Sequence, residues 1–586
     1  MRGPITKSPS YTIISFICAF LVALAATPAQ AQVDLSGMWA GRFHEDQEHR
    51  VPGPELGDYL GLPINDAARM KADAWDASIL SLREHQAKPH PATYSLRGPA
   101  NIRISRILDP VTQATIGWEI FGTFGQATRT IYTDGRARPP SWAAHTWGGF
   151  SLGRWVGDSL EVETTHLKVG WIQRNGVAHS DRATMTEHFF RHGDILTAVT
   201  VVKDPVYLEE PFVRTSNWLL DPRQDVLRTQ FDIVDEVTRH PQGYVPHLLP
   251  GSPGFEAKKT EFAQRKGLPP DAIRGGAATT RPEYDPTKSP TPTPVPRNPS
   301  GASRPSGLLT EEQDPATPTM WHVQGNVWML VGAGANIAVQ IGDEGVLLVD
   351  TGKKGTSDEV LKAIRTVTDK PIRIIINTGS DADHAGANEP IAKVGRWLAG
   401  NAPGNGGLPT ITARVIAHEQ TMTQMSAAKQ PFASWPTETF LDDKELFFNG
   451  EAIQILHQSG HTDGDAIVFF RRSDVIAAGD VFSTVSYPVI DRARGGSVQG
   501  TLDALNRIID LAIPKDHEEG GTYVIPGHGR VCDEADVVEY RDMLTIVRDR
   551  VNARDQRPTL DYDARYGSAD ALIAAVSSAA PGRPAR

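Results

Sequence analysis

The sequence of 586 residues contains only two cysteines, and after its first 31 residues it has no apolar run long enough to cross a bilayer. Cys18 lies near the N-terminus, so removal of that end would leave Cys532 alone and no intramolecular disulfide could form. Basic charge is also scarce, since the formal net charge at pH 7 is −11. An acidic chain without a broad basic face disfavours nucleic acid as a partner. We therefore expect hydrophobic cores or metal ions, rather than disulfides, to stabilise the chain.

The first 31 residues have the pattern of a secretory signal peptide. Arg2 and Lys7 form a short basic start, residues 13–26 are apolar, and Ala29-Gln30-Ala31 offers a small-residue cleavage site. The apolar stretch is shorter than the roughly 20 residues that span a membrane. We therefore predict a periplasmic or secreted protein with no stable membrane anchor after cleavage.

Proline is unevenly distributed and marks a boundary between two halves. Residues 269–318 contain 12 of the 43 prolines, and a segment this rich in proline favours extended, solvated backbone. A chain of this length is also too long for one hydrophobic core. We therefore predict five segments, which are a signal peptide (1–31), a β-rich domain (33–262), a linker (263–318), an α/β domain (319–556) and a C-terminal helix with a tail (557–586).

The first half has the pattern of short strands joined by turns. In GRWVGDSLEVETT the pair Gly157-Asp158 separates two apolar segments, which is typical of a β-hairpin. Aromatic and β-branched residues recur in IGWEIFGTFG and TRTIY, which favours an antiparallel barrel or sandwich. The stretches DLSGMW and RTIYTDGRARPP resemble an uncharacterised β-rich module of exported bacterial proteins, and this resemblance implies no known chemistry. Five histidines lack ligand-like spacing and are expected to be surface or packing residues, namely His145, His166, His179, His188 and His192.

From about residue 321 the pattern of apolar residues changes. Apolar runs such as GVLLVD, IRIIIN, AIVFF and DVIAAGD alternate with helical patterns such as SDEVLKAIRTV and LDALNRIIDLA. Strands that are apolar throughout are buried on both faces, so helices are expected to cover the sheets. The pattern predicts an α/β layered domain.

Polar residues gather where these apolar runs stop. Asp383 and His384 follow IRIIIN, His461 follows AIQILHQS, Asp480 ends DVIAAGD, and His528 follows TYVIP. Loops at strand ends are where such a scaffold brings distant residues together. Carboxylate and imidazole are ligands that zinc accepts. We therefore expect these five side chains to form one metal-binding cluster.

Four motifs occur in order at these positions, namely NTGSDADHAGAN, GHTDGD, GDVF and PGHG. In this order, and with VLLVDTG as the early strand, they resemble the metallo-β-lactamase superfamily over residues 321–555. The resemblance implies an αββα sandwich, in which two sheets lie between helices and a metal site lies at one edge. The superfamily loop HxHxDH is replaced here by GxDxDH, with Gly379 and Asp381 in place of two histidines.

Carried over to this sequence, the resemblance implies a complete second metal site and a depleted first site. The second site would consist of Asp383, His384, His528 and the shared carboxylate Asp480. The first site would keep only His461 and Asp480, with Asp381 as a possible oxygen ligand. We expect one or two zinc ions, and the carboxylates also suit iron or manganese.

The expected reaction is hydrolysis of an ester, lactone, amide or related bond in a small-molecule substrate by metal-activated water. Asp381, Asp383 and His461 are expected to take part, with Asp381 either a ligand or the general base. Two alternatives stay open, which are a catalytically degenerate binding or scaffold protein and an iron-dependent redox enzyme on the same fold. The pattern does not indicate an oligomeric state.

A glycine-rich polar loop, residues 486–500, follows Asp480 and would suit one wall of the site. Tyr487, Arg492 and Arg494 are its candidates for contact with substrate. The alternative interpretation is an exposed loop without such a role.

Overall fold

The computed structural model describes residues 33–42, 53–96, 100–123, 125, 127–227, 233–234, 243–288, 315–396, 412–514 and 521–579. The predicted signal peptide and the central part of the proline-rich segment lie outside the described residues, so export stays a prediction. Within the described ranges, no helix is both long enough and apolar enough to cross a membrane.

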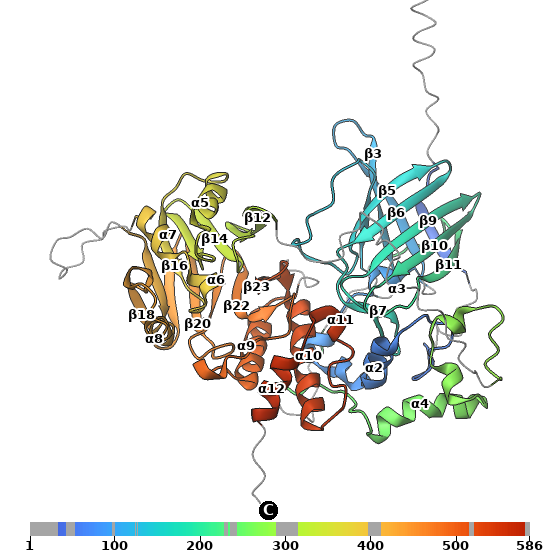
Figure 1. The fold of residues 1–586 in the computed structure, drawn as a ribbon. Helices are drawn as coiled ribbons and strands as arrows, with labels where there is room; N and C mark the ends of the chain where they lie inside the picture. The colour runs from blue at the N-terminus through green and yellow to red at the C-terminus, as the bar shows by residue number, and fades with distance from the viewer. Residues whose placement is uncertain are drawn as a thin grey trace, which may run out of the picture.

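Nine strands of the first half form a closed barrel, in the order β1-β11-β10-β9-β6-β5-β4-β3-β2 (Figure 1). Neighbouring strands are antiparallel except for β4 and β5, which are parallel. The alternation of buried and exposed residues along β10 shows that one strand face lines the barrel core and the other faces outward. The predicted antiparallel β domain is therefore confirmed, and of the two forms expected, barrel or sandwich, it is a barrel. Its strands are β1 (Gly37–Gly41), β2 (Ile102–Leu108), β3 (Thr115–Gly122), β4 (Arg129–Tyr132), β5 (Phe150–Val156), β6 (Ser159–Thr165), β9 (Thr184–His192), β10 (Ile195–Lys203) and β11 (Phe212–Leu220).

Shorter elements accompany the barrel. The hairpin of β7 and β8 packs near α2 and α3, and α4 follows the barrel in the chain. Their bounds are α2 (Asp66–Ala74), α3 (Ala92–Ser95), β7 (Gly170–Gln173), β8 (Val177–His179) and α4 (Pro253–Lys266).

The second half contains two sheets. The first has seven strands in sequence order and is parallel from β15 to β18. Its strands are β12 (Thr319–Gln324), β13 (Val327–Val331), β14 (Ile337–Gly342), β15 (Gly345–Val349), β16 (Ile372–Ile376), β17 (Arg414–His418) and β18 (Glu438–Phe440). The second has six strands, of which β22 and β23 are parallel. Its strands are β19 (Lys444–Phe448), β20 (Glu451–His457), β21 (Ala466–Phe470), β22 (Val475–Ser483), β23 (Tyr523–His528) and β24 (Cys532–Asp533).

Helices cover the outer face of each sheet. In β15, Leu347 belongs to the core between the two sheets, whereas Leu348 belongs to the core under α5 and α7. In β21, Val468 belongs to the core between the two sheets, and its neighbour Ile467 belongs to the core under α9, α10 and α12. This double burial explains why these strands are apolar at every position, and the predicted αββα layers are confirmed. The helices are α5 (Ser357–Arg365), α6 (Ala382–Ala385), α7 (Asn388–Val394), α8 (Glu419–Ala427), α9 (Val498–Leu511), α10 (Glu534–Asn552), α11 (Asp563–Tyr566) and α12 (Asp570–Ala579).

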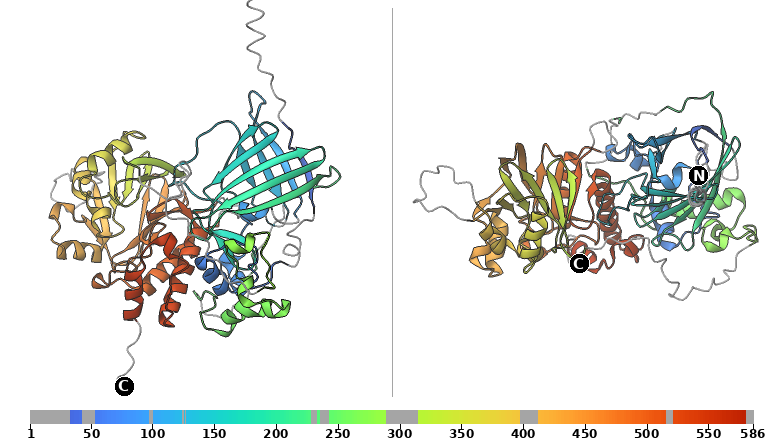
Figure 2. Two further views of the ribbon diagram at one scale, coloured as in Figure 1. Left: turned by 45° about the vertical axis from the view of Figure 1, so that its right-hand side comes forward. Right: turned by 90° about the horizontal axis from the view of Figure 1, so that it is seen from above.

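Buried ion pairs join the two halves around α10 and α11, and in the right-hand view of Figure 2 the red C-terminal helices lie between the barrel and the sheets. Lys168 of the first half lies 2.7 Å from both Asp533 and Asp536 of the second. Asp181 of the first half accepts hydrogen bonds of 2.6 and 2.8 Å from Arg565. Such pairs tolerate little displacement, because each partner left alone would be a buried charge.

The predicted linker begins too early. Residues 263–288 fold against the first half, with Ala263 and Ile273 fully buried and Tyr59 donating a backbone hydrogen bond to Ile273. The first two prolines of the segment, Pro269 and Pro270, begin a 3₁₀ turn rather than an extended chain. This is possible because proline is well suited to the first positions of a helical turn. The central part of the linker, residues 289–314, lies outside the described residues.

A cavity of about 660 Å³ lies between α2, β7 and α10. Trp75, Trp147 and Trp171 line it, together with Asp536 and Glu539 of α10. None of the predicted metal ligands lines this cavity. The cavity is therefore a feature of the junction between the halves and separate from the predicted metal cluster.

The junction makes a stability prediction at Asp181. Although burial alone would raise its pKa, Arg565 and Arg530 hold the pKa of Asp181 well below the usual value. Asp181→Ala would leave two buried guanidinium groups without this partner, and we expect it to lower the free energy of unfolding by about 3–5 kcal/mol. Urea denaturation measures the loss.

The matched control is Asp134→Ala, which removes an exposed ion pair with Arg136 and should leave the urea midpoint unchanged. Because the pKa of Asp181 is lowered by folding, its contribution is present above the pKa of an unfolded aspartate, about 3.9, and is lost as the pH falls further. Equal midpoints for the two variants at neutral pH would contradict the prediction.

Candidate metal centre

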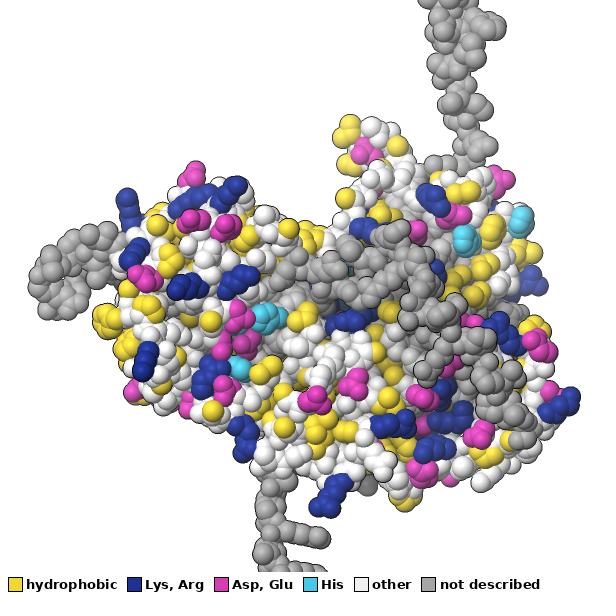
Figure 3. Space-filling model, in the orientation of Figure 1, with side chains coloured by type: hydrophobic (Ala, Val, Ile, Leu, Met, Phe, Trp, Pro, Cys, Tyr) yellow, Lys and Arg dark blue, Asp and Glu magenta, His cyan; other side chains and the backbone are white. Residues whose placement is uncertain are grey.

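The predicted ligands meet at one edge of the two sheets, where the parallel strands β15, β16, β22 and β23 end. Asp480 is on β22 and His528 is the last residue of β23, so the parallel pairing of these strands places both at the same edge. Asp383 and His384 lie on α6, the single helical turn that follows β16. Figure 3 shows acidic and histidine side chains gathered on this face of the C-terminal half. The cluster is therefore open to solvent on one side.

His384 is the most deeply buried residue of the cluster, with 1% of its surface exposed. Its Nδ1 lies 2.7 Å from Asp350 Oδ2, so the ring donates from Nδ1 and turns Nε2 toward Asp480. Its backbone carbonyl accepts a 2.8 Å hydrogen bond from Thr351 N. These contacts fix the orientation of the ring and leave Nε2 available as a metal ligand.

Asp350 is itself held under strain. Its φ of +67° lies in the left-handed region, which aspartate adopts more readily than most residues. The carboxylate accepts hydrogen bonds of 2.8 and 2.6 Å from the backbone N and the hydroxyl of Thr378. Thr378 lies in the loop that carries the ligands, so Asp350 orients both this loop and the ring of His384.

Three separations among the second-site residues are close to those between the ligands of a tetrahedral ion. His384 Nε2 is 3.0 Å and His528 Nε2 is 3.6 Å from Asp480 Oδ1, and His528 Nε2 is 3.2 Å from Asp383 Oδ2. Ligand atoms about 2.0–2.1 Å from a zinc ion are about 3.3 Å apart along a tetrahedral edge. His384 Nε2 is buried and has no hydrogen-bond partner, although a carboxylate oxygen lies 3.0 Å away. An ion between these two atoms would satisfy both, so the residues fit a metal.

The charge of the cluster also favours a cation. Burial alone would lower the pKa of His384, but Asp480 and Asp350 on its two sides raise it well above the usual value. The same histidine charge, together with the other two histidines, lowers the pKa of Asp480 despite its burial. A site that stabilises a proton on His384 so strongly is negatively charged, and a metal ion would compete with that proton.

A close approach of two strands places Asp480 against the loop of His528. A Cβ at Gly527 would lie 2.7 Å from Asp480 Oδ1 and 2.8 Å from the carbonyl oxygen of Gly479. No side chain fits there, because atoms of a neighbouring backbone cannot move aside. Glycine at position 527 is therefore required for the cluster to close.

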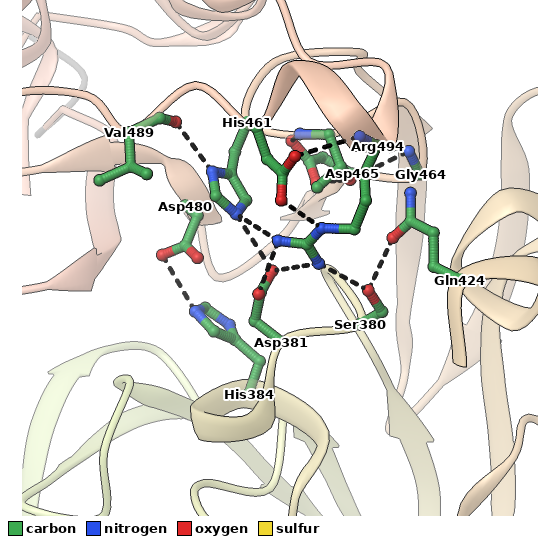
Figure 4. A network of polar contacts seen from close by, with 12 residues as sticks. Ser380, Asp381, His384, Gln424, His461, Gly464, Asp465, Asp480, Val489 and Arg494 are labelled. Carbon is green, nitrogen blue, oxygen red and sulfur yellow. Dashed lines mark hydrogen bonds and ion pairs between the residues drawn. The ribbon is translucent and has the colours of Figure 1, made fainter. Parts of the chain in front are cut away.

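The depleted first site is also assembled, but it contains an arginine (Figure 4). Ligand atoms of Asp381, His461 and Asp480 lie within 4.8 Å of one another. Arg494 Nη2 lies 2.8 Å from Asp381 Oδ1, and Nη1 lies 3.2 Å from Asp381 Oδ2. His461 Nε2 is 3.1 Å from Asp381 Oδ2. Both oxygens of Asp381 are thus already bonded by protein groups.

His461 is oriented in the same manner as His384. Its Nδ1 is 2.8 Å from the carbonyl oxygen of Val489, which directs Nε2 toward Asp381. Burial alone would lower its pKa, but the hydrogen bond to Asp381 and the charges of Asp480 and Asp465 raise the pKa to about 9. The protonated ring therefore donates to Asp381, and its 3.2 Å contact with Arg494 Nη2 is not a hydrogen bond in that state.

The structure brings together all six residues that the sequence indicated as ligands, adds Asp350, and shows a contact of Arg494 that the sequence did not indicate. Asp350 was overlooked although it ends the apolar run GVLLVD just as Asp480 ends DVIAAGD, which was a usable signal. Arg494 was named for substrate contact but not for its pairing with Asp381. The prediction that Tyr487 contacts substrate was wrong, because Tyr487 is buried in the core under α9 and α10 and donates a hydrogen bond to Asp563. Arg492 instead pairs with Ser578 of α12.

The comparisons with known proteins agree with this fold. Residues 323–528 match the family model of the metallo-beta-lactamase superfamily, so the C-terminal half has the metallo-β-lactamase fold and the predicted resemblance is confirmed there. The predicted resemblance of the N-terminal half to an exported module stays a prediction.

Among curated proteins, the chain is similar to a linear primary-alkylsulfatase of Pseudomonas sp. (strain ATCC 19151), with 24% identity over 236 residues. This match covers 36% of the present chain and 43% of the alkylsulfatase, so it spans less than half of that relative. A metallo-beta-lactamase structure from Pontibacter korlensis has 17% identity and a TM-score of 0.32, over 39% of this chain and 98% of that one. The structure of the sec-alkylsulfatase Pisa1 from Pseudomonas sp. has 14% identity and a TM-score of 0.34, over 45% of this chain and 50% of that one.

The hydrogen bond between Asp350 and His384 makes a prediction about metal affinity. Asp350→Asn keeps the size of the side chain and its tolerance of the left-handed region but removes the charge that orients His384. We expect the affinity for zinc to fall about 10- to 100-fold, measured by competition with a chromophoric chelator. Asp358→Asn, on the exposed first turn of α5, is the control and should bind zinc as the parent does. An unchanged affinity in Asp350→Asn would show that the residue does not support the ligand.

Proposed function

We propose that the chain is a metal-dependent hydrolase that holds its ion between Asp383, His384, Asp480 and His528. The observation that carries the proposal is the buried Nε2 of His384, which Asp350 directs into a cluster of ligand atoms at tetrahedral spacing. The family model supports a hydrolase of this fold. The two carboxylates and two imidazoles suit zinc, and the carboxylates also suit iron or manganese.

A bound divalent ion would supply Lewis-acid activation of water and of the bond to be cleaved. Asp383 and His528 lie on the open side, with 41% and 33% of their side chains exposed, whereas His384 closes the inner side. Substrate can therefore approach from solvent while the inner ligand stays fixed. This division between a buried anchor and accessible ligands is what a catalytic rather than purely structural site needs.

The structure argues for a changed role of Asp381. Burial alone would raise its pKa, but the hydrogen bonds from His461 and Arg494 hold the pKa below the usual value. A carboxylate with a lowered pKa and two bonded oxygens is a poor general base. We propose instead that Asp381 holds Arg494 and His461 in place. His461, fixed by Val489 and positively charged, would then stabilise negative charge that develops on the substrate.

The substrate class that we propose is a small ester with an anionic group. Arg494, His461 and a bound ion would together place positive charge at the open edge of the site, which suits an anionic ester. The match to an alkylsulfatase adds sulfate esters to the esters, lactones and amides expected from the sequence. Sulfate esters are therefore the first substrates to test.

His384→Ala tests the proposal most directly, because it removes the buried ligand. We expect the variant to lose its bound metal and at least about 100-fold of its hydrolytic rate, more than the loss of a supporting partner costs. Metal content is measured by plasma mass spectrometry for zinc, iron and manganese. Rates are measured on alkyl sulfates, lactones, β-lactams, thioesters and phosphodiesters.

His322→Ala is the matched control, since His322 is an exposed histidine of the same domain on β12. It should keep the metal and the rate of the parent. A parent protein without metal and without turnover on the whole panel would overturn the proposal and favour a binding or scaffold role. Iron with a visible absorbance band and no hydrolysis would favour the redox alternative.

A further inference from the structure

Arg494 occupies the place between the first-site residues where the superfamily resemblance leads one to expect a metal ion. In Figure 4 its guanidinium points between Asp381 and His461, on the side of the cluster away from His384. Nη2 lies 2.8 Å from Asp381 Oδ1 and 3.2 Å from His461 Nε2. A permanent positive charge therefore contacts two of the three residues that make up this group.

Several hydrogen bonds hold this guanidinium. Arg494 Nε donates to Asp491 Oδ2 over 2.7 Å, and Nη1 donates to Ser380 Oγ over 3.0 Å. Ser380 in turn donates to Gln424 over 2.6 Å. The planar fork of arginine is well suited to such a bidentate contact with Asp381, and because the group is already ordered it loses little further freedom.

The backbone of the loop adds to this placement. Arg494 ends the 3₁₀ turn η7 (Arg492–Arg494), whose N-cap residue Asp491 accepts a hydrogen bond from Arg494 N. Asp491 N donates to the carbonyl of His461, and Asp463 N donates to the carbonyl of Arg494. Two backbone bonds thus attach the arginine turn to the loop that carries His461. The position of Arg494 is a property of two packed loops and not of one side chain.

The substitutions in the metal-binding loop fit this arrangement. Two histidines at positions 379 and 381 would be neutral ligands and would remove one of the two carboxylates that pair with the nearby guanidinium. Asp381 supplies this carboxylate, and Gly379 leaves room beside it, because a Cβ at Gly379 would approach only Asp465 at 3.7 Å and Asp381 at 4.0 Å. The sequence GxDxDH and the arginine 113 residues away are therefore chemically complementary.

We propose that the Arg494 guanidinium takes the place of the first metal ion, so that the protein binds one divalent ion per chain, at the second site alone. A divalent ion at the first site would have to displace Arg494 from Asp381 or lie beside its like charge, and both are unfavourable. The inference rests on the proposed function for its metal at the second site. Arg494 is thus a positioning residue that sets the metal stoichiometry.

The test counts zinc ions in a series of variants. Each protein is saturated with zinc, desalted and analysed for zinc per chain, with circular dichroism to confirm folding. The parent, Arg494→Lys and the neighbouring control Arg492→Ala should each hold one ion, because each keeps a positive charge at position 494. Arg494→Ala should hold a second, weaker ion at raised zinc concentration, since it frees Asp381 and His461.

A rebuilt first site gives the strongest test. The triple variant Gly379→His, Asp381→His, Arg494→Ala restores two imidazoles in the space at positions 379 and 381 and removes the guanidinium. It should hold two zinc ions per chain, whereas Gly379→His with Asp381→His and an intact Arg494 should hold one. If the triple variant does not fold, Arg494→Ala alone decides the question.

Three outcomes would overturn the inference. Two zinc ions in the parent would show that the guanidinium moves aside for metal. One ion in both Arg494→Ala and the folded triple variant would show that Arg494 does not exclude the second ion. Two ions in Arg494→Lys would show that charge at this position is not the cause. Absence of any zinc in the parent would instead overturn the proposed function, so the two failures are distinguishable.

Discussion

The arrangement of the C-terminal half depends on one electrostatic constraint, which is that several carboxylates converge where parallel strands end. Asp350, Asp381 and Asp480 lie close enough to share partners with His384 and His461. So much negative charge in a partly buried place is stable only if positive charge accompanies it. The raised pKa values of His384 and His461 are the response of the protein's own titratable groups to this requirement. A metal ion or an arginine can also supply this positive charge. The side of Asp381 and His461 has Arg494, whereas the side of Asp383, His384 and His528 fits a metal ion.

Much of this site could be predicted from the sequence, because its residues follow apolar runs and the ends of parallel strands converge. Asp383, His384, Asp480 and His528 were found in this way, and Asp350 could have been found by the same signal. The pairing of Arg494 with Asp381 could not, since it depends on a 3₁₀ turn that folds a loop back over 113 residues of separation. No local pattern in the sequence indicates such a contact. The strand-end residues can be predicted because hydrophobic periodicity indicates the strands, whereas the position of Arg494 depends on how loops pack in the whole fold.

The same distinction explains the results outside the site. Alternation predicted strands in the first half, but it could not decide between a barrel and a sandwich, because both have one buried strand face. The linker began too early for a related reason. Proline content predicts extended backbone on average, yet residues 263–288 also contain Ala263 and Ile273, which are buried together with Phe262, and Ile273 accepts a hydrogen bond from Tyr59 N. Composition indicates only whether a segment tends to be extended. Tertiary contacts override that tendency where apolar side chains of the segment pack against the rest of the protein.

The first half of the chain bears on the metal centre through the segment that follows His528. Arg530, two residues later, is buried and lies 2.8 Å from Asp536 of α10 and 3.4 Å from Asp181 of the first half. On the other side, Asn336 donates to the carbonyls of Pro526 and Gly529 over 3.0 Å each. His528 is therefore carried by a short turn that is held by the first sheet at one end and by the first half at the other. Contacts from both sides thus connect the first half of the chain to the position of His528 in the candidate metal centre, although all six candidate ligands lie in the second half.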